Sequence, residues 1–202
     1  MPADSLGHLT RPATGDAEGL LVLFHGRGAD ERDLYPLLDL LDPRRRLHGG
    51  TPRGPLHLPP GGAHWYAVKE IGYPDPPTFT ETLRIASAWL DDLASEVGAP
   101  AERMVLGGFS QGAVMTYALS GFMPSVPGFQ IDLETSLPRV AIGHGVGDPV
   151  ISVDWGRDAR TRLENAGADL TYHESPSMGH SIDPAFLRTL PAWLDETMRI
   201  AA

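Results

Sequence analysis

Hydrophobic residues along the chain first gather in the run Leu20–Phe24, which is apolar at every position. Such a run is typical of a parallel strand that is buried on both faces. It ends in His25-Gly26-Arg27-Gly28, a tight loop, after which Leu34, Leu37, Leu38 and Leu41 recur at helical spacing. The first part of the chain therefore predicts one strand-helix unit.

The same alternation of apolar runs and helical spacing continues to the C-terminus. Helices are predicted over 78–97, 113–119, around 161–166 and over 186–198, and strands over 103–108, 139–142 and 170–173. Thr78 to Glu81 matches a capping box at the start of the long helix. We therefore expect an α/β fold: one domain spanning residues 1–202, with a mostly parallel, doubly wound sheet and helices on both faces.

The segment 52–77 interrupts this pattern because it is rich in proline and glycine, with Trp65, Tyr66 and Tyr73 between them. Ordered helices and central strands rarely tolerate this composition. We predict a long loop, which either walls a pocket or covers the core.

Composition narrows the possible partners and cofactors. The net charge of −10 argues against nucleic acids and anionic membrane surfaces as partners, and the absence of cysteine excludes disulfides and a cysteine nucleophile. No apolar run approaches the ~20 residues needed to cross a bilayer, and no signal sequence is recognisable, so a cytoplasmic location is expected. The eight histidines show no metal-binding spacing, and neither a metal nor another cofactor is expected.

The sequence Gly108-Phe109-Ser110-Gln111-Gly112 lies between a predicted strand and a predicted helix. G-x-S-x-G in this context indicates a nucleophile elbow, a strained turn that exposes a reactive serine. The flanking glycines are required where neighbouring backbone comes too close for a Cβ atom.

A serine hydroxyl requires a histidine base and an acid that orients the imidazole, and in hydrolases with this elbow the chain order is serine, acid, histidine. Asp148 and His180 fit this order, each on a loop that follows a predicted strand. Competing acids and histidines remain: Asp132, Glu134, Asp154, Asp169, His144 and His173.

Stabilisation of an oxyanion requires two backbone N–H donors, one from the residue after the nucleophile and one from the loop after an early strand. These donors are predicted to be Gln111 and a residue within 26–28. Gly26 and Gly28 would let the backbone approach a substrate, but they would also suit a simple tight turn at the end of the strand.

Together, the motifs around Gly26, Ser110, Asp148 and His180 resemble the phospholipase/carboxylesterase family of α/β-hydrolases, relatives of the acyl-protein thioesterases. The resemblance covers most of the chain from about Leu20. It implies a cofactor-free carboxylesterase that acts on small-molecule acyl esters of short to medium chain length. It also implies that Arg27 supplies the second oxyanion N–H and that Trp65 lies near the substrate pocket.

The interval between Ser110 and Asp148 is short for this family, and the part between Gly121 and Pro138 shows no strand pattern. We predict that one central strand is absent, so that the strand ending at Ile142 either pairs directly with the one ending at Gly107 or leaves a gap filled by a partner chain. A homodimer is a further prediction, since an exposed edge strand or the aromatic residues Trp155 and Trp193 could form an interface, although these residues could also simply pack. Two functional alternatives stay open: a thioesterase or lysophospholipase-like hydrolase, and a catalytically impaired fold that binds a ligand or partner.

Overall fold

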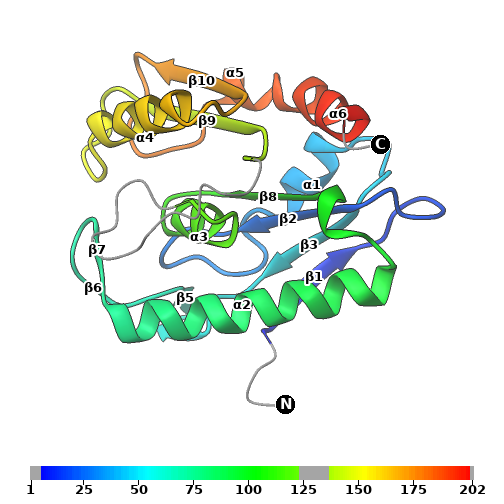
Figure 1. The fold of residues 1–202 in the computed structure, drawn as a ribbon. Helices are drawn as coiled ribbons and strands as arrows, with labels where there is room; N and C mark the ends of the chain where they lie inside the picture. Colours follow the sequence, from blue (N-terminus) through cyan, green and yellow to red (C-terminus); the bar gives the residue numbers. More distant parts are fainter. Residues whose placement is uncertain (1–5, 123–136, 201–202) are drawn as a thin grey trace.

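The computed structural model describes residues 6–122 and 137–200, and its larger sheet has four strands in the order β1-β3-β2-β8 (Figure 1). Strand β2 pairs in parallel with β3 and β8, whereas β1 is antiparallel to β3. The strands are β1 (His8–Arg11), β2 (Leu20–Phe24), β3 (His48–Pro52) and β8 (Met104–Gly108). Predominantly parallel pairing was predicted, and the sheet confirms it.

Strand β2 is buried at all five positions because helices cover both faces of the sheet. Leu20, Val22 and Phe24 pack in one core cluster with helices α2 (Pro76–Val97) and α3 (Gln111–Leu119). Leu21 and Leu23 face a second cluster with α1 (Tyr35–Leu41) and α6 (Leu190–Ile200). This two-sided burial explains why the run is apolar throughout.

A second, two-stranded sheet pairs β9 (Val140–Gly145) in parallel with β10 (Leu170–Ser175), and α4 (Val153–Asn165) packs on it. Within the described residues β8 and β9 do not pair with each other, so the predicted direct pairing is wrong. Most of the segment on which the predicted loss of a central strand depends, residues 123–136, lies outside the described residues.

The predicted long loop over 52–77 contains two small antiparallel hairpins, which the sequence did not predict. The first joins β4 (Leu56–Leu58) to β5 (Gly62–His64), and the second joins β6 (Val68–Glu70) to β7 (Tyr73–Pro74). Strands of two or three residues are too short to produce a recognisable alternation of apolar and polar positions.

The long helix begins at Pro76, earlier than predicted, and its N-cap is Asp75. The Asp75 carboxylate accepts a hydrogen bond from the Thr78 N–H at 3.2 Å. The predicted capping box at Thr78 is therefore wrong, because Thr78 already lies inside the first turn. The predicted final helix is divided into α5 (Pro184–Leu187) and α6.

The C-terminal ends of the parallel strands carry the loops that hold the predicted site residues. The loop at Gly26 follows β2, Ser110 follows β8, Asp148 follows β9 and His180 follows β10. Ligands of open α/β sheets bind at this edge. Among the described residues, no helix is both long and apolar enough to cross a membrane.

Candidate active site

Ser110 occupies the turn between β8 and α3 with φ 54° and ψ −118°, a conformation that is strained for a residue with a side chain. The turn is tight enough to exclude Cβ atoms on both sides. A Cβ on Gly108 would lie 2.4 Å from the carbonyl carbon of Gly112, and one on Gly112 would lie 1.9 Å from the Phe24 oxygen. The glycines are therefore required for the close contact of this turn with itself and with β2.

His180, on the loop after β10, connects the serine to an acid. Its Nε2 lies 3.0 Å from Ser110 Oγ, and its Nδ1 lies 2.8 Å from Asp148 Oδ2. Because a carboxylate only accepts hydrogen bonds, Nδ1 carries the proton and Nε2 accepts from the serine hydroxyl. The ring also packs against Phe109, with the ring centroids 4.9 Å apart.

Asp148 is almost completely buried, with its side chain 6% exposed. Burial alone would raise the pKa of this carboxyl group, but the N–H of Ile151, the imidazole of His180 and the N–H of Val150 outweigh it and lower the pKa. The two backbone donors bind Oδ1 at 2.9 and 2.8 Å, which leaves Oδ2 for His180. The carboxylate is thus held ionised and in a fixed orientation.

The competing residues have other partners. His144 Nε2 donates to the Ile151 carbonyl at 3.0 Å and lies 3.6 Å from Asp148 Oδ2, beyond hydrogen-bond distance. His173 contacts Asp183 at 2.9 Å. Asp154 and Asp169 form ion pairs with Arg157 and Arg139, respectively. The remaining two candidates, Asp132 and Glu134, lie outside the described residues.

The loop that carries His180 is closed at its base by Asp183. The hydroxyl of Ser175, at the end of β10, donates to Asp183 Oδ2, and the N–H of Ala185 donates to Oδ1. Together with His173, these donors lower the pKa of Asp183 to about 2. The two ends of the His180 loop are thereby held together, a contact that the sequence did not indicate.

The loop after β2 lies against the first hairpin. The Gly28 N–H donates to the Ala63 carbonyl, and the Ala63 N–H donates to the Ala29 carbonyl, both at 2.8 Å. Within residues 6–122 and 137–200, the backbone N–H groups of Arg27 and Gln111 donate to no backbone carbonyl of a loop or helix cap. Both predicted donors thus retain their capacity for a ligand.

Trp65 is completely buried, and its predicted place near the substrate pocket stays a prediction. Its indole N–H donates to the His25 carbonyl at 2.8 Å, and its backbone N–H donates to the Gln111 side chain at 3.0 Å. His25 itself is 1% exposed. Trp65 therefore joins the β2 loop to the start of α3 from inside the core.

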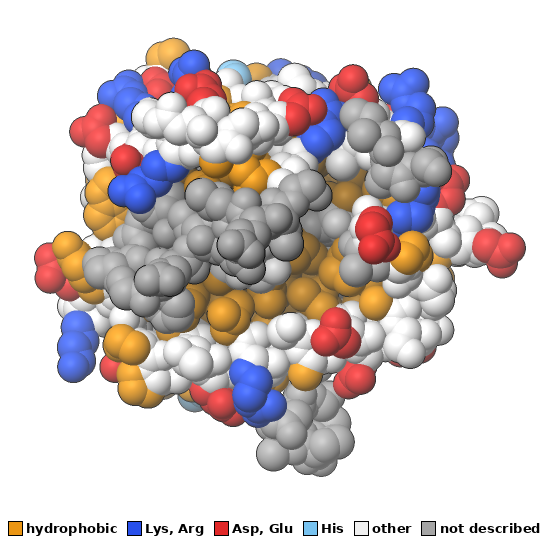
Figure 2. Space-filling model, in the orientation of Figure 1, with side chains coloured by type: hydrophobic (Ala, Val, Ile, Leu, Met, Phe, Trp, Pro, Cys, Tyr) orange, Lys and Arg blue, Asp and Glu red, His pale blue; other side chains and the backbone are white. Residues whose placement is uncertain are grey.

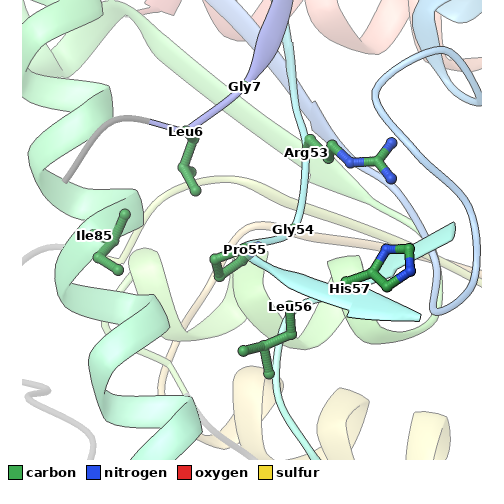
Figure 3. Close-up of a pocket in the computed structure, with 8 residues that line it drawn as sticks. All are labelled: Leu6, Gly7, Arg53, Gly54, Pro55, Leu56, His57 and Ile85. Carbon is green, nitrogen blue, oxygen red and sulfur yellow. The ribbon is translucent and has the colours of Figure 1, made fainter. Parts of the chain in front are cut away.

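A cavity of about 310 Å³ lies beside this region and is separate from Ser110, Asp148 and His180 (Figure 3). Leu6, Pro55, Leu56 and Ile85 supply its apolar wall, while Arg53 and His57 supply polar groups. Arg53 is already paired with Glu31 at 2.9 Å. Among the described residues, no cluster of three or more metal-binding side chains occurs.

The model of the phospholipase/carboxylesterase family matches residues 10–198, nearly the whole chain. The chain belongs to this family. The esterase YpfH of Escherichia coli, a relative, is 30% identical over 83% of this chain and 78% of its own length. The acyl-protein thioesterase 1 homolog 1 of Dictyostelium discoideum is 26% identical over 77% of this chain and 75% of its own length. Members of the family are hydrolases of the esterase and thioesterase type.

Solved structures show the same fold. The Bacillus cereus carboxylesterase superposes with a TM-score of 0.81 at 23% identity and covers 95% of this chain and 94% of its own. The esterase PE8 superposes with a TM-score of 0.80 at 28% identity and covers 95% of this chain and 99% of its own. The predicted α/β-hydrolase fold is confirmed.

Proposed function

We propose that this chain is a serine carboxylesterase that hydrolyses small carboxylic esters of short to medium acyl length through an acyl-enzyme. The proposal rests on one observation above all: His180 contacts Ser110 Oγ at 3.0 Å through one ring nitrogen and Asp148 Oδ2 at 2.8 Å through the other. Nucleophile, base and orienting acid in this arrangement are the constellation of serine hydrolases.

In the first half of the reaction, Ser110 Oγ attacks the ester carbonyl while His180 Nε2 accepts the hydroxyl proton. His180 then protonates the leaving alcohol as the tetrahedral intermediate collapses to an acyl-serine. Asp148 remains ionised and stabilises the imidazolium formed in between. The N–H groups of Gln111 and Arg27 would donate to the oxyanion of the intermediate.

In the second half, water replaces the alcohol. His180 accepts a proton from water, the resulting hydroxide attacks the acyl carbonyl, and Ser110 is released with its proton restored. The products are a carboxylic acid and an alcohol, and no external cofactor enters the balance.

Hydrolysis of p-nitrophenyl acetate, butyrate and octanoate by the protein and its Ser110→Ala variant tests this function. We expect the variant to lose roughly 10³-fold or more of kcat, because no other group replaces the nucleophile. Equal rates in the two well-folded proteins would contradict the proposal.

A thioesterase activity at the same site is the second candidate, favoured by the relatives named acyl-protein thioesterases. The same three groups cleave oxygen and sulfur esters, so matched pairs of oxygen esters and thioesters would reveal the preference. A catalytically impaired binding protein, which the short interval between Ser110 and Asp148 suggested, is disfavoured by the 2.8 Å contact between Asp148 and His180. A homodimer and a cytoplasmic location stay predictions; size-exclusion chromatography with light scattering would test the former.

A further inference from the structure

His25 follows β2 directly and is 1% exposed, yet it is not one of the three residues that form the proposed catalytic group. Both of its ring nitrogens are in use. Nδ1 lies 2.7 Å from the carbonyl oxygen of Gly26, and Nε2 lies 3.0 Å from the backbone nitrogen of Gly54. His25 is thus fixed by hydrogen bonds as well as by packing, at the start of the loop that carries Arg27.

The two partners determine the protonation of the ring. The Gly54 N–H is a donor, so Nε2 must accept and carries no proton. Nδ1 therefore carries the single proton and donates it to the Gly26 carbonyl. Burial also lowers the pKa of His25, which favours this neutral form.

The Gly26 carbonyl and the Arg27 N–H belong to the same peptide unit. Because that unit is planar and trans, the two groups point in opposite directions, and fixing one fixes the other. The Gly26 carbonyl accepts from Nδ1 of the buried His25 ring at 2.7 Å and, more weakly, from the Ala29 N–H at 3.2 Å. The shorter bond fixes the carbonyl toward the His25 ring, so the Arg27 N–H points away from that ring. Gly26 also lies next to the elbow: a Cβ on it would be 3.1 Å from the Phe109 ring, one residue before Ser110.

A buried chain of hydrogen bonds connects His25 to the other predicted donor, Gln111. The Gln111 side chain accepts from the Trp65 N–H at 3.0 Å and donates to the Tyr66 carbonyl at 2.9 Å. The Trp65 indole donates to the His25 carbonyl at 2.8 Å. The residues that carry the two N–H donors, Gln111 and Arg27, are thus linked through Trp65 and His25.

Gly54 binds the ring nitrogen of His25 that faces away from Gly26. It lies between Arg53 and Pro55, on the segment that leaves β3 along the wall of the cavity (Figure 3). A Cβ on Gly54 would lie 2.7 Å from the His64 carbonyl oxygen, so this backbone is confined. The His25 ring is therefore held between the loop after β2 and the segment after β3.

We propose that His25 is a positioning residue of the oxyanion hole: by donating from Nδ1 to the Gly26 carbonyl, it aims the Arg27 N–H at the oxyanion of the transition state. This inference rests on the proposed esterase function. The bond to the carbonyl also polarises the peptide and strengthens its N–H as a donor. Since the oxyanion exists only after attack, the contribution of His25 belongs to the transition state and not to ester binding.

Two variants of similar size separate positioning from packing. In His25→Asn the amide nitrogen can take the place of Nδ1 and keep the bond to Gly26, while the acceptor for Gly54 is lost. In His25→Gln the amide oxygen can take the place of Nε2 and keep the bond to Gly54, while the donor to Gly26 is lost. Each variant loses one buried hydrogen bond, so both should show a similar fall in Tm.

We expect kcat for p-nitrophenyl butyrate to fall roughly 10- to 100-fold in His25→Gln with KM unchanged, and by less than about fivefold in His25→Asn. Equal losses in the two variants, or a His25→Gln variant that keeps its kcat, would overturn the role of His25. An inactive parent protein would instead refute the proposed function itself, so the two failures can be told apart.

A measurement on the unsubstituted chain decides the matter if either variant fails to fold. Long-range ¹H–¹⁵N spectra should show the His25 proton on Nδ1. After Ser110 is phosphonylated, the Arg27 amide proton should move downfield as it bonds the phosphonyl oxygen. A proton on Nε2 of His25, or an unchanged Arg27 amide, would overturn the inference.

Discussion

Ser110 combines a strained backbone with a hydroxyl that is hydrogen-bonded to His180. Such a conformation costs about 1–3 kcal/mol and persists because the surrounding structure enforces it. Here β2 and α3 enforce it from both sides, through the close contacts at Gly108 and Gly112. At the scale of single residues, the site is therefore pre-organised before a substrate binds.

Asp148 is the residue at which the orientation of His180 can be tested. In Asp148→Asn an amide could present its N–H to Nδ1, which would force the imidazole into the wrong tautomer. We expect kcat to fall by roughly 10³- to 10⁴-fold with the fold intact by circular dichroism. Asp154→Asn, on the exposed start of α4, is the matched control and should keep its activity. A fully active Asp148→Asn variant would contradict the assignment.

At the scale of elements, the His180 loop depends on Asp183, whose pKa is lowered from 3.8 to about 2, first by the Ser175 hydroxyl and then by Ala185 and His173. Because the pKa in the folded state is the lower one, these contacts stabilise the protein above the ordinary carboxyl pKa. That contribution is lost as the pH falls from about 5 toward about 2.

We therefore expect Asp183→Asn to lower Tm at pH 6, with the difference from the parent protein shrinking toward pH 3. Thermal melts at several pH values measure this directly. The kcat of the variant should also fall, because the loop that carries His180 loses its closure. A difference in Tm that is constant over this pH range would refute the role assigned to the ionised carboxylate.

The turn around Ser110 depends on the close backbone contact between Gly112 and β2. A Cβ on Gly112 would lie 1.9 Å from a backbone oxygen of β2, which cannot yield easily. We expect Gly112→Ala to lower the free energy of unfolding by about 3 kcal/mol and to abolish activity. Gly61→Ala, where no atom lies within 4 Å of the added Cβ, should change it by less than about 0.5 kcal/mol in the same urea titration. Equal effects would contradict the packing argument.

Elements whose side chains carry a pattern could be predicted from the sequence, whereas β3 could not. Its residues include Gly49 and Gly50, and neither has a side chain that could show alternation. The glycines have a physical cause: a Cβ on Gly49 would lie 2.9 Å from Leu38 of α1, and one on Gly50 would lie 3.2 Å from Leu93 of α2. The helices on both faces come too close to this strand for larger residues.

The same limit applies to the site. Ser110, Asp148 and His180 could be proposed from motif, order and placement after strands. The roles of Trp65 and His25 depend on which backbone groups they reach across the fold, at separations of about 30 to 46 residues, and no local pattern encodes those partners.

At the scale of the whole molecule, charged side chains surround a band of hydrophobic side chains that crosses the middle of the face shown, between α4 and α2 (Figure 2). Each arginine of the cluster Arg44, Arg45 and Arg46 is paired with a carboxylate. Asp195 pairs with both Arg44 and Arg46, Glu18 also pairs with Arg46, and Asp39 pairs with Arg45. With a net charge of −10, the molecule offers phosphates little attraction.

We therefore expect no binding to a short DNA duplex even at low salt, measured by fluorescence anisotropy. Binding of the duplex that weakens with added salt would contradict this prediction, because it would reveal a basic surface on a chain of negative net charge.

The central claim is that Ser110, activated by His180, forms a covalent acyl-enzyme. Labelling with a fluorophosphonate followed by peptide mass spectrometry tests it most directly. We predict one adduct per chain, located on Ser110, absent from Ser110→Ala and formed roughly 10³-fold more slowly in His180→Ala. An adduct on another residue, or labelling that is unchanged in Ser110→Ala, would contradict this account.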